Sequence, residues 1–433
     1  MKVLIVGSGG REHALVWAVR RSRRAPQVYC APGNGGTARE AVNVPIAADR
    51  VDQLASFAKS EGVELTIVGP EQPLTLGIVD RFEALGLRIV GPSAAAARLE
   101  GSKAFAKAFM QRHGIPTGDC LQTRSLDEAL STARSGRFGF PLVIKADGLA
   151  AGKGVIVAPN LAEAETAIRQ ILEERVLGEA GSTILLEQFL VGEEVSFLVF
   201  SDGIHALPMV PSQDHKTVFD NDLGPNTGGM GAYSADWILS SSAHGELMER
   251  IVLPTLAGMA AEGTPYRGVL YFGLMLTREG IKVLEYNARM GDPETQPILL
   301  RLESDFLDVC EALLEQRLDR MRLQWDAQRS VCVVLASGGY PGEYEKGIEI
   351  SGLYGIEKPA VKVFHAGTEL RNGSLVTAGG RVLGVTAKAG TLQAALDLAY
   401  STVERIQFRN MHFRRDIGRR GLAKEHSMAG HRS

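Results

Sequence analysis

The sequence predicts a multidomain protein of mixed α/β and α+β class, with a Rossmann-like parallel sheet at the N-terminus and a small β-rich domain at the C-terminus. Its 433 residues correspond to about three domains of ~150 residues each. Strand-like and helical segments alternate through the first part of the chain, which is typical of a parallel sheet with ligand loops at the carboxyl ends of its strands. Farther along, strand pairs joined by turns indicate antiparallel pairing.

The composition excludes several classes of protein. Lys and Arg number 47 against 50 Asp and Glu, a net charge of −3, whereas a nucleic-acid-binding domain is usually strongly basic. The 45% hydrophobic content argues against disorder, and the four cysteines form no Cys-x-x-Cys pair that would predict a zinc site. No apolar run approaches the ~18 residues that span a membrane, and the first residues lack a signal-peptide pattern. We therefore expect a cytoplasmic protein without nucleic-acid or membrane partners.

The first predicted strand, residues 3–6, ends in a glycine loop that leads into a helix at 11–19. A dinucleotide-binding fingerprint needs a third glycine where this chain has Glu12. The loop can still present backbone N–H groups to a phosphate, so we predict phosphate binding without nicotinamide, with a purely structural turn as the alternative. Further strands are predicted at 27–30, 65–68 and 87–90. Polar loops follow them at the same sheet edge, and Glu71 in one of these loops is suited to bind sugar hydroxyls.

A helix at 102–112 precedes a predicted β-hairpin with a long, glycine-rich tip, whose strands are residues 141–145 and 155–157. Lys145 lies at the end of a buried strand, where nucleotide phosphates are suitable partners for its charge. One charge pair at about 4 Å interacts by ~4 kcal/mol at an effective dielectric constant of ~20. The glycine loop can cover the phosphates and exclude water, although it lacks the Walker pattern. A plain hairpin with a solvated lysine is the alternative.

Two later segments supply further candidate site residues. The chain that leaves a predicted strand at 183–187 can offer backbone groups to an adenine edge, and Glu194 can accept ribose hydroxyls; surface acids are the alternative. Glu285 and Asn287 lie two apart on a strand and so face one side, where two oxygens suit Mg²⁺ held jointly with phosphates. Arg289 can hold the negative charge that develops in phosphoryl transfer. A helix at 160–177, a long polar loop at 214–233 and a strand pair at 268–287 complete this region.

The C-terminal region is predicted to contain strands at 331–336, 361–365, 375–377 and 382–386 and a helix at 391–405. From Phe408 onward, seven Arg and Lys stand against two acids, and we predict a frayed, solvated tail. The basic run at 20–24 is likewise predicted to be a solvated helix end. The predicted domains are 1–102, 103–325 with a small lid subdomain at about 121–192, and 326–433.

Several long motifs identify a resemblance. Residues 145–155, 187–194 and 284–294 together resemble the ATP-grasp fold, which we therefore expect in the middle of the chain. Residues 7–14, 31–37, 212–216, 222–233 and 287–296 resemble, more narrowly, the phosphoribosylamine–glycine ligase family (glycinamide ribonucleotide synthetase). The resemblance covers nearly the whole chain, and its motifs occur in the same order.

The resemblance implies an ATP-dependent ligase of the second step of de novo purine synthesis. In this family, glycine carboxylate attacks the γ-phosphate of ATP, and the amine of 5-phosphoribosylamine displaces the resulting acyl phosphate to give glycinamide ribonucleotide, ADP and phosphate. The implied ATP-binding residues are Lys103, Lys145, Lys153, Glu187, Leu190 and Glu194. The implied ligands of Mg²⁺ or Mn²⁺ are Glu285 and Asn287.

The resemblance also implies residues for the other substrates. Near the acyl phosphate it places the candidate catalytic residues Asp214, Lys216 and Arg289. On the phosphoribosylamine side it places Gly9, Gly10, Asn34, Glu71, Asp292 and, from the last domain, Arg381, which is expected to reach the sugar phosphate. The chain departs from the family pattern at two positions. Gly273 stands where many ATP-grasp ligases have a third metal-binding acid, and Thr217 stands where this family often has Arg.

The implied partners are small molecules: ATP, glycine and 5-phosphoribosylamine. We expect a bacterial-type, single-activity monomer, with at most a transient contact with the preceding enzyme of the pathway. Three other hypotheses remain: another ATP-grasp carboxylate–amine ligase of purine synthesis, a nicotinamide oxidoreductase built on the first glycine loop, and a protein that senses ATP without hydrolysing it.

Overall fold

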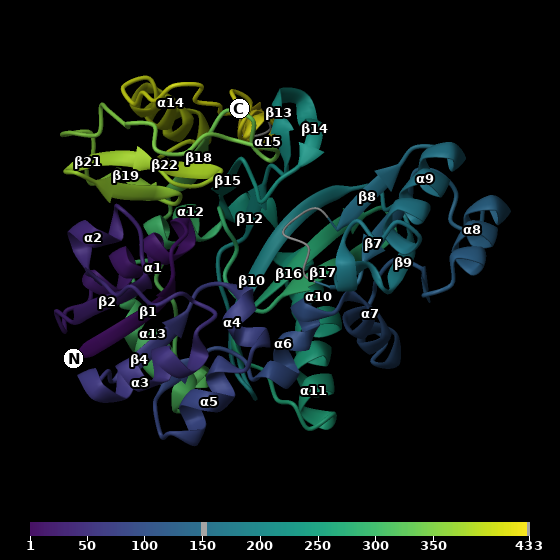
Figure 1. The fold of residues 1–433 in the computed structure, drawn as a ribbon, viewed down its shortest axis with the longest axis horizontal. Helices are drawn as coiled ribbons and strands as arrows, with labels where there is room; N and C mark the ends of the chain where they lie inside the picture. Colours follow the sequence, from purple (N-terminus) through teal and green to yellow (C-terminus); the bar gives the residue numbers. More distant parts are fainter. Residues whose placement is uncertain (149–153, 431–433) are drawn as a thin grey trace.

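The computed structural model describes residues 1–148 and 154–430 and begins with the predicted parallel sheet (Figure 1). The strand order is β3-β2-β1-β4-β5, and every neighbouring pair is parallel. Its strands are β1 (Lys2–Gly7), β2 (Gln27–Pro32), β3 (Val42–Asn43), β4 (Leu65–Val68) and β5 (Ile89–Val90). The helices of this region are α1 (Gly10–Arg20), α2 (Thr37–Glu40), α3 (Val51–Glu61), α4 (Glu71–Thr75), α5 (Ile78–Ala84) and α6 (Ala94–Gly101). The predicted Rossmann-like sheet is confirmed.

A separate four-stranded antiparallel sheet with the order β6-β9-β7-β8 contains the predicted hairpin. The sheet and two helices form one unit, whose elements are β6 (Cys120–Thr123), α8 (Leu126–Ser135), β7 (Leu142–Ala146), β8 (Val155–Ala158), α9 (Leu161–Leu172) and β9 (Ile184–Gln188). In Figure 1 this unit projects to the right of the molecule, and α7 (Lys103–Arg112) lies beside it. Ala129, Ile144, Ile168 and other apolar side chains fill the space between the sheet and the two helices.

The largest sheet has nine strands and joins the middle of the chain to its C-terminal part. Its order is β17-β16-β10-β12-β15-β18-β22-β19, with β11 paired to β10. Its strands are β10 (Glu193–Asp202), β11 (Ala206–Pro208), β12 (Ser212–Asp214), β15 (Gly231–Ser234), β16 (Arg267–Thr277), β17 (Gly280–Asn287), β18 (Arg329–Ala336), β19 (Val361–His365) and β22 (Arg381–Ala389). The pairing of β15 with β18 makes the sheet continuous between the two regions, which no local pattern predicted.

The other elements of this half of the chain include two hairpins and several helices. They are β13 (Thr217–Phe219), β14 (Leu223–Asn226), α10 (Ser241–Leu247), α11 (Leu253–Ala261), α12 (Thr295–Arg301), α13 (Phe306–Leu314), β20 (Thr368–Arg371), β21 (Ser374–Thr377), α14 (Leu392–Val403) and α15 (Arg419–Gly430). The prediction of one long polar loop at 214–233 is therefore wrong. That segment contains the β13–β14 hairpin and the strand β15, whose four residues are buried but directly follow a polar, glycine-rich stretch that resembles a loop.

The predicted solvated tail is also wrong. Phe408 and Ile417 are buried, and the Arg414 side chain is 1% exposed. The Arg414 guanidinium donates to Asp416, to both oxygens of Thr217 and to Asp222, so the C-terminal segment holds the β13–β14 hairpin. A high count of basic residues suggested solvent exposure because sequence alone did not show these acidic partners.

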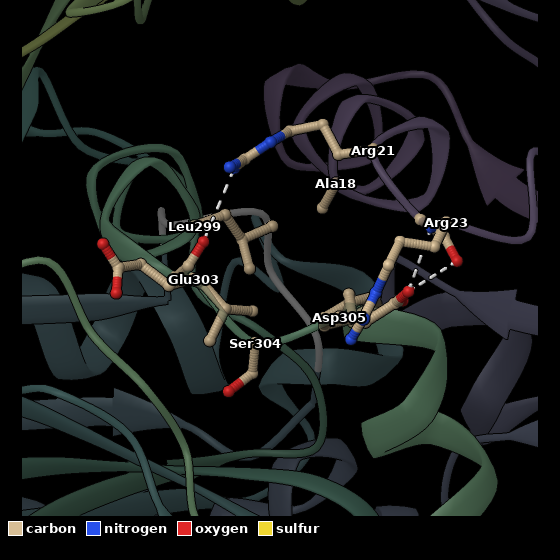
Figure 2. Close-up of a pocket in the computed structure, with 10 residues that line it drawn as sticks. Ala18, Arg21, Arg23, Leu299, Glu303, Ser304 and Asp305 are labelled. Carbon is tan, nitrogen blue, oxygen red and sulfur yellow. Dashed lines mark hydrogen bonds between the residues drawn. The ribbon is translucent and has the colours of Figure 1, made fainter.

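The basic run at the end of α1 is likewise partnered in part. Ser22 donates through Oγ to Asp305 at 2.7 Å, and Arg24 forms ion pairs with Asp308 and Glu311 of α13. A small polar cavity of about 130 Å³ lies at this junction, lined by Arg21 and Arg23 on one side and by residues 302–306 on the other (Figure 2). The end of α1 therefore docks the parallel sheet region onto α13.

None of the described helices combines the length and apolar character that a membrane span requires.

Replacing Arg414 with Met is expected to lower the free energy of unfolding by about 2–4 kcal/mol, because it removes a buried cation and leaves Asp416, which is 16% exposed, without this ion pair. Asp222 is more exposed and keeps its pair with Arg420. Urea unfolding measures the change. Arg409→Met is the matched control, since Arg409 and Glu345 are 64% and 58% exposed and such a pair contributes less than about 1 kcal/mol. Equal effects of the two substitutions would contradict the anchoring role of Arg414.

Candidate active site

The lysine-bearing hairpin and the acidic strand lie directly beside one another. The Lys145 ammonium donates to the carbonyl of Leu284 on β17 at 3.1 Å and lies 2.9 Å from Glu187 Oε2. Lys103 donates to the carbonyl of Gly148, just beyond β7, at 3.1 Å. Two candidate phosphate-binding lysines are thereby placed next to Glu285, the neighbour of Leu284 in the chain.

Asp147 fixes the start of α7 against the hairpin. Its Oδ1 accepts hydrogen bonds from Ser102 Oγ at 2.8 Å and from the Ala104 N–H at 2.7 Å, while Ser102 Oγ accepts from the Phe105 N–H. These bonds satisfy helix N–H groups that have no partner within the helix itself. The turn after Lys145 and the first residue of α7, Lys103, are held together as a result.

Glu285 and Asn287 face one side of β17, while Tyr286 between them is buried in the core. Gly273 pairs with Glu285 across the strands, and a Cβ at Gly273 would lie 2.9 Å from Glu285 Cγ. The missing third acid thus leaves space that the Glu285 side chain occupies. Burial alone would raise the pKa of Glu285, but the charges of Lys216, Lys145 and Lys103 hold it below its usual value.

The oxygen pair fits a divalent cation that is shared with phosphates. Within residues 1–148 and 154–430, no cluster of three or more His, Cys, Asp or Glu side chains is suited to hold a metal ion. Glu285 and Asn287 present a carboxylate and an amide oxygen, which are hard ligands of the kind Mg²⁺ prefers. An ion with only two protein ligands keeps water and takes phosphate oxygens for its remaining positions.

Lys216 links the candidate ribose acid to the candidate metal ligand. Its Nζ lies 2.9 Å from Glu194 Oε2 and 3.8 Å from Glu285 Oε1. Asp214 is close to this cation, and burial raises the pKa of its carboxyl to about 7, with Lys216 opposing the shift and Glu294 adding to it. The three residues Asp214, Lys216 and Glu194 are therefore brought together.

Arg289 is held by two carboxylates from the N-terminal region. Its guanidinium lies 3.2 Å from Glu71 Oε2 and 2.7 Å from Glu100 Oε1, and Glu100 also accepts the Ala288 N–H at 2.6 Å. Burial raises the pKa of Glu100 to about 7, against the opposing charge of Arg289. Arg289 also donates to Asn287 Oδ1 at 3.3 Å, which connects it to the oxygen pair.

Asp292 lies between the first glycine loop and the C-terminal region. Arg381 pairs with Asp292 Oδ2 at 3.1 Å and donates to the carbonyls of Asp292 and Gly228. A Cβ at Gly9 would lie 3.3 Å from Asp292 Oδ2, and one at Gly10 would lie 2.6 Å from Gln296 Nε2. The side chains of the 289–296 segment therefore pack directly against this loop.

Glu12 explains why the glycine loop is no dinucleotide site. The Gly9 N–H donates to the Glu12 carboxylate, which also pairs with Arg11 and is 3% exposed. A Cβ at Gly7 or Gly69 would meet the Glu12 side chain within 2.6 Å. The anion position at the start of α1 is therefore occupied by a carboxylate of the same chain.

Asn34 joins three loops. Its amide donates to the carbonyls of Ser8 and His365, both at 2.8 Å, and its Oδ1 accepts the N–H groups of Gly36 and Thr37. These bonds use both hydrogens of the amide. The side chain of Asn34 holds the loop, so a direct contact with a substrate would need a rearrangement of these bonds.

The structure gathers the predicted residues into two adjoining groups. The first is Lys103, Lys145, Glu187, Glu194, Asp214, Lys216, Glu285 and Asn287; the second is Gly9, Gly10, Asn34, Glu71, Arg289, Asp292 and Arg381. Leu190 is buried beside Gly118, and Lys153 lies outside the described residues. The cavity of Figure 2 includes none of these residues among its lining.

Sequence reasoning missed three charged side chains that complete the site. Lys107 pairs with Glu187, Glu100 pairs with Arg289, and Arg11 donates to the Met290 carbonyl. Buried Glu294, which lies in the 287–296 motif, accepts from Ser196 Oγ at 3.1 Å. Only Lys107 carried a usable signal, since it lies one helical turn after Lys103 among apolar residues.

The fold and these contacts first define a class. A lysine-bearing hairpin of one sheet beside an acidic strand of a larger sheet is the arrangement of ATP-grasp proteins. The biotin carboxylase domain of Hydrogenobacter thermophilus 2-oxoglutarate carboxylase, solved with MgADP and bicarbonate, aligns with a TM-score of 0.72. The alignment covers 95% of this chain and 91% of that one at 17% identity, so it shows the fold alone.

The family follows from closer comparisons. The N, ATP-grasp (A) and C domains of phosphoribosylglycinamide synthetase match residues 1–100, 101–295 and 330–420. The phosphoribosylamine–glycine ligases of Vibrio vulnificus and Allochromatium vinosum are 52% and 53% identical to this chain, covering 98% and 99% of it and 99% and 100% of the relatives. The crystal structure of the Thermotoga maritima ligase aligns with a TM-score of 0.84 at 34% identity, over 96% of this chain and 100% of that one. The chain belongs to the phosphoribosylglycinamide synthetase family and is an ATP-dependent ligase.

A pH-sensitive ion pair joins the loop of Asn34 to the C-terminal region. Glu40 Oε1 accepts from His13 Nε2 at 3.3 Å and from Lys362 Nζ at 2.6 Å, and His13 Nδ1 accepts the N–H of His365. Burial alone would raise the pKa of Glu40, but His13 and Lys362 hold it at about 2. The carboxylate therefore stabilises the folded state above its ordinary pKa, and this contribution is lost as the pH falls from about 4.5 toward 2.

Glu40→Gln is expected to remove about 1–3 kcal/mol of stability at pH 7 and much less at pH 2–3, because protonation removes the same charge in the unsubstituted chain. Urea unfolding at several pH values measures the difference. Glu173→Gln, at an exposed pair with Arg169, is the matched control and is expected to change stability by less than about 1 kcal/mol. A Glu40→Gln effect that is independent of pH would contradict this role.

Proposed function

We propose that the two groups of residues catalyse the ligation of glycine to 5-phosphoribosylamine through a glycyl phosphate, giving glycinamide ribonucleotide, ADP and phosphate. The observation that carries the assignment is the contact of Lys145 with the Leu284 carbonyl, which joins the candidate phosphate lysines to the oxygen pair of β17. Lys103 and Lys145 bind phosphates, and Glu187, the backbone near Leu190 and Glu194 bind the nucleoside. Lys153, outside the described residues, is proposed to act on the loop above them.

The proposed metal is Mg²⁺ or Mn²⁺, held by Glu285 and Asn287. When bound, it neutralises phosphate charge and polarises the phosphoryl oxygens. Lys216 lies beside Glu285, and Arg289 lies beside Asn287, so both cations are placed to stabilise charge on the transferred phosphoryl group. Ionic partners on both cations fix their positions before substrates arrive.

The second group is proposed to orient 5-phosphoribosylamine. Glu71 and Asp292 present carboxylates to hydroxyls or the amine, and Gly9 and Gly10 allow close approach to the backbone. Nη1 and Nη2 of Arg381 contact carbonyl oxygens and Asp292, and the proposed contact with the sugar phosphate uses the remaining N–H donors of the guanidinium. Orientation of an amine against an acyl phosphate can contribute about 7–11 kcal/mol to the lowering of the barrier.

The proposed domains contribute to the binding of different substrates. Residues 103–325, with a lid subdomain at about 121–192, contribute the nucleotide side. Residues 1–102 and 326–433 contribute the phosphoribosylamine side together with Arg289 and Asp292 of the middle domain. We further propose that the enzyme acts as a cytoplasmic monomer, with at most transient contact with the enzyme that supplies its unstable amine.

The reaction is tested by an assay of ADP formation with 5-phosphoribosylamine generated in place and one substrate omitted at a time. We expect ADP only when ATP, glycine and the amine are all present. Phosphate release that ignores glycine and the amine would instead indicate an ATP-binding protein without ligase chemistry. Saturable binding of NADH would revive the oxidoreductase hypothesis.

Glu285→Ala is expected to reduce ADP formation by at least about 100-fold while the chain stays folded, because it removes the only charged member of the oxygen pair. Steady-state kinetics at several Mg²⁺ and Mn²⁺ concentrations measure the loss. Glu279→Ala, at the exposed turn before the same strand, is the control and is expected to retain activity. Undiminished turnover of Glu285→Ala would remove the metal assignment.

A further inference from the structure

Lys107 is a buried lysine that no part of the proposed chemistry uses. It lies on α7, one turn after Lys103, and its side chain is 5% exposed. Its Nζ lies 3.2 Å from Glu187 Oε2, donates to Thr117 Oγ1 at 2.8 Å and is 3.4 Å from the Gly118 carbonyl. A lysine this deeply buried is retained only where its charge is matched.

Two lysine ammonium groups contact the same carboxylate oxygen of Glu187. Lys107 and Lys145 both approach Oε2, at 3.2 and 2.9 Å. Burial alone would raise the pKa of Glu187, but the two lysines together hold it below its usual value. The carboxylate, 6% exposed, thus stays ionised between two cations.

When a nucleotide binds, its phosphates compete with Glu187 for the Lys145 ammonium. In the structure its ammonium lies between Glu187 and the Leu284 carbonyl, whereas the proposed function requires it to bind phosphates. If Lys145 were the only cation beside Glu187, its movement toward phosphate would leave a carboxylate buried without a partner, which is strongly unfavourable. A second cation on the same oxygen removes this conflict.

We propose that Lys107 is a positioning residue, which neutralises Glu187 and thereby frees Lys145 to bind the phosphates of a nucleotide. Lys107 acts through Glu187 and makes no contact with the phosphates itself. This inference rests on the proposed function, since it assumes that a nucleotide binds between the hairpin and β17.

Binding of MgADP and of adenosine to the full chain separates this role from a structural one. Lys107→Met is expected to weaken MgADP binding by about 10- to 100-fold, the loss typical of one charged hydrogen bond, because Lys145 stays with Glu187. Adenosine carries no phosphate, and its affinity is expected to change less than about 3-fold. Lys388→Met, at a half-buried pair with Asp326 in the C-terminal region, is the matched control and is expected to leave both affinities unchanged. Equal losses for MgADP and adenosine in Lys107→Met would overturn the proposal.

A second pair of variants tests whether Lys107 acts through Glu187, and it serves even if Lys107→Met does not fold. In the Glu187→Gln background, adding Lys107→Met is expected to leave the ratio of MgADP to adenosine affinity unchanged, because no carboxylate remains to retain Lys145. A further fall in that ratio would show that Lys107 contacts the phosphates directly and would overturn the proposal. If the unsubstituted chain fails to bind MgADP, the proposed function itself fails, so the two failures are distinguishable.

Discussion

The site depends on polar and ionic contacts along one segment, residues 284–292. The hairpin, the N-terminal region and the C-terminal region each contribute a partner to it. The carbonyl of Leu284 accepts from Lys145 of the hairpin, Arg289 pairs with Glu71 and Glu100 of the N-terminal region, and Asp292 pairs with Arg381 of the C-terminal region. A charge buried without its partner costs several kcal/mol. Displacement of any one of these parts would therefore leave unpaired charges, and the same pairs that build the site hold the parts in register.

Local sequence patterns predicted the elements that carry the site because each of them has a local physical cause. Alternation of strand-like and helical segments predicted the parallel sheet, and side-chain alternation along a strand predicted that Glu285 and Asn287 share one face. Motif resemblance added residues whose role is not visible from spacing, such as Asp214 and Lys216. The structure places one of them, Lys216, beside the candidate metal ligand Glu285, with 3.8 Å between Nζ and Oε1.

The features that sequence reasoning missed depend on pairs of residues far apart in the chain. Arg414 was assigned to a solvated tail because its partners Thr217 and Asp222 lie almost 200 residues earlier. The strand β15 was assigned to a loop because its glycine and polar side chains become buried only when β18 pairs with it. Glu100 gave no local signal, since its importance arises from Arg289, 189 positions later. In each case the missing information is a partner, which no local propensity encodes.

Three of the described cations of the site are paired with carboxylates of the same chain. Lys145, Lys216 and Arg289 each have a carboxylate within about 3 Å, so a polyphosphate competes with these carboxylates for the same cations. Such pairing holds the cations in place before binding and limits the reorganisation that phosphoryl transfer requires. It also means that each carboxylate needs another partner when its cation turns to the phosphates. Glu187 has one in Lys107, and Glu285 has one in the divalent cation it is proposed to bind. Under the proposed function, Glu187 and Glu285 thus keep a partner when their cations turn to the phosphates.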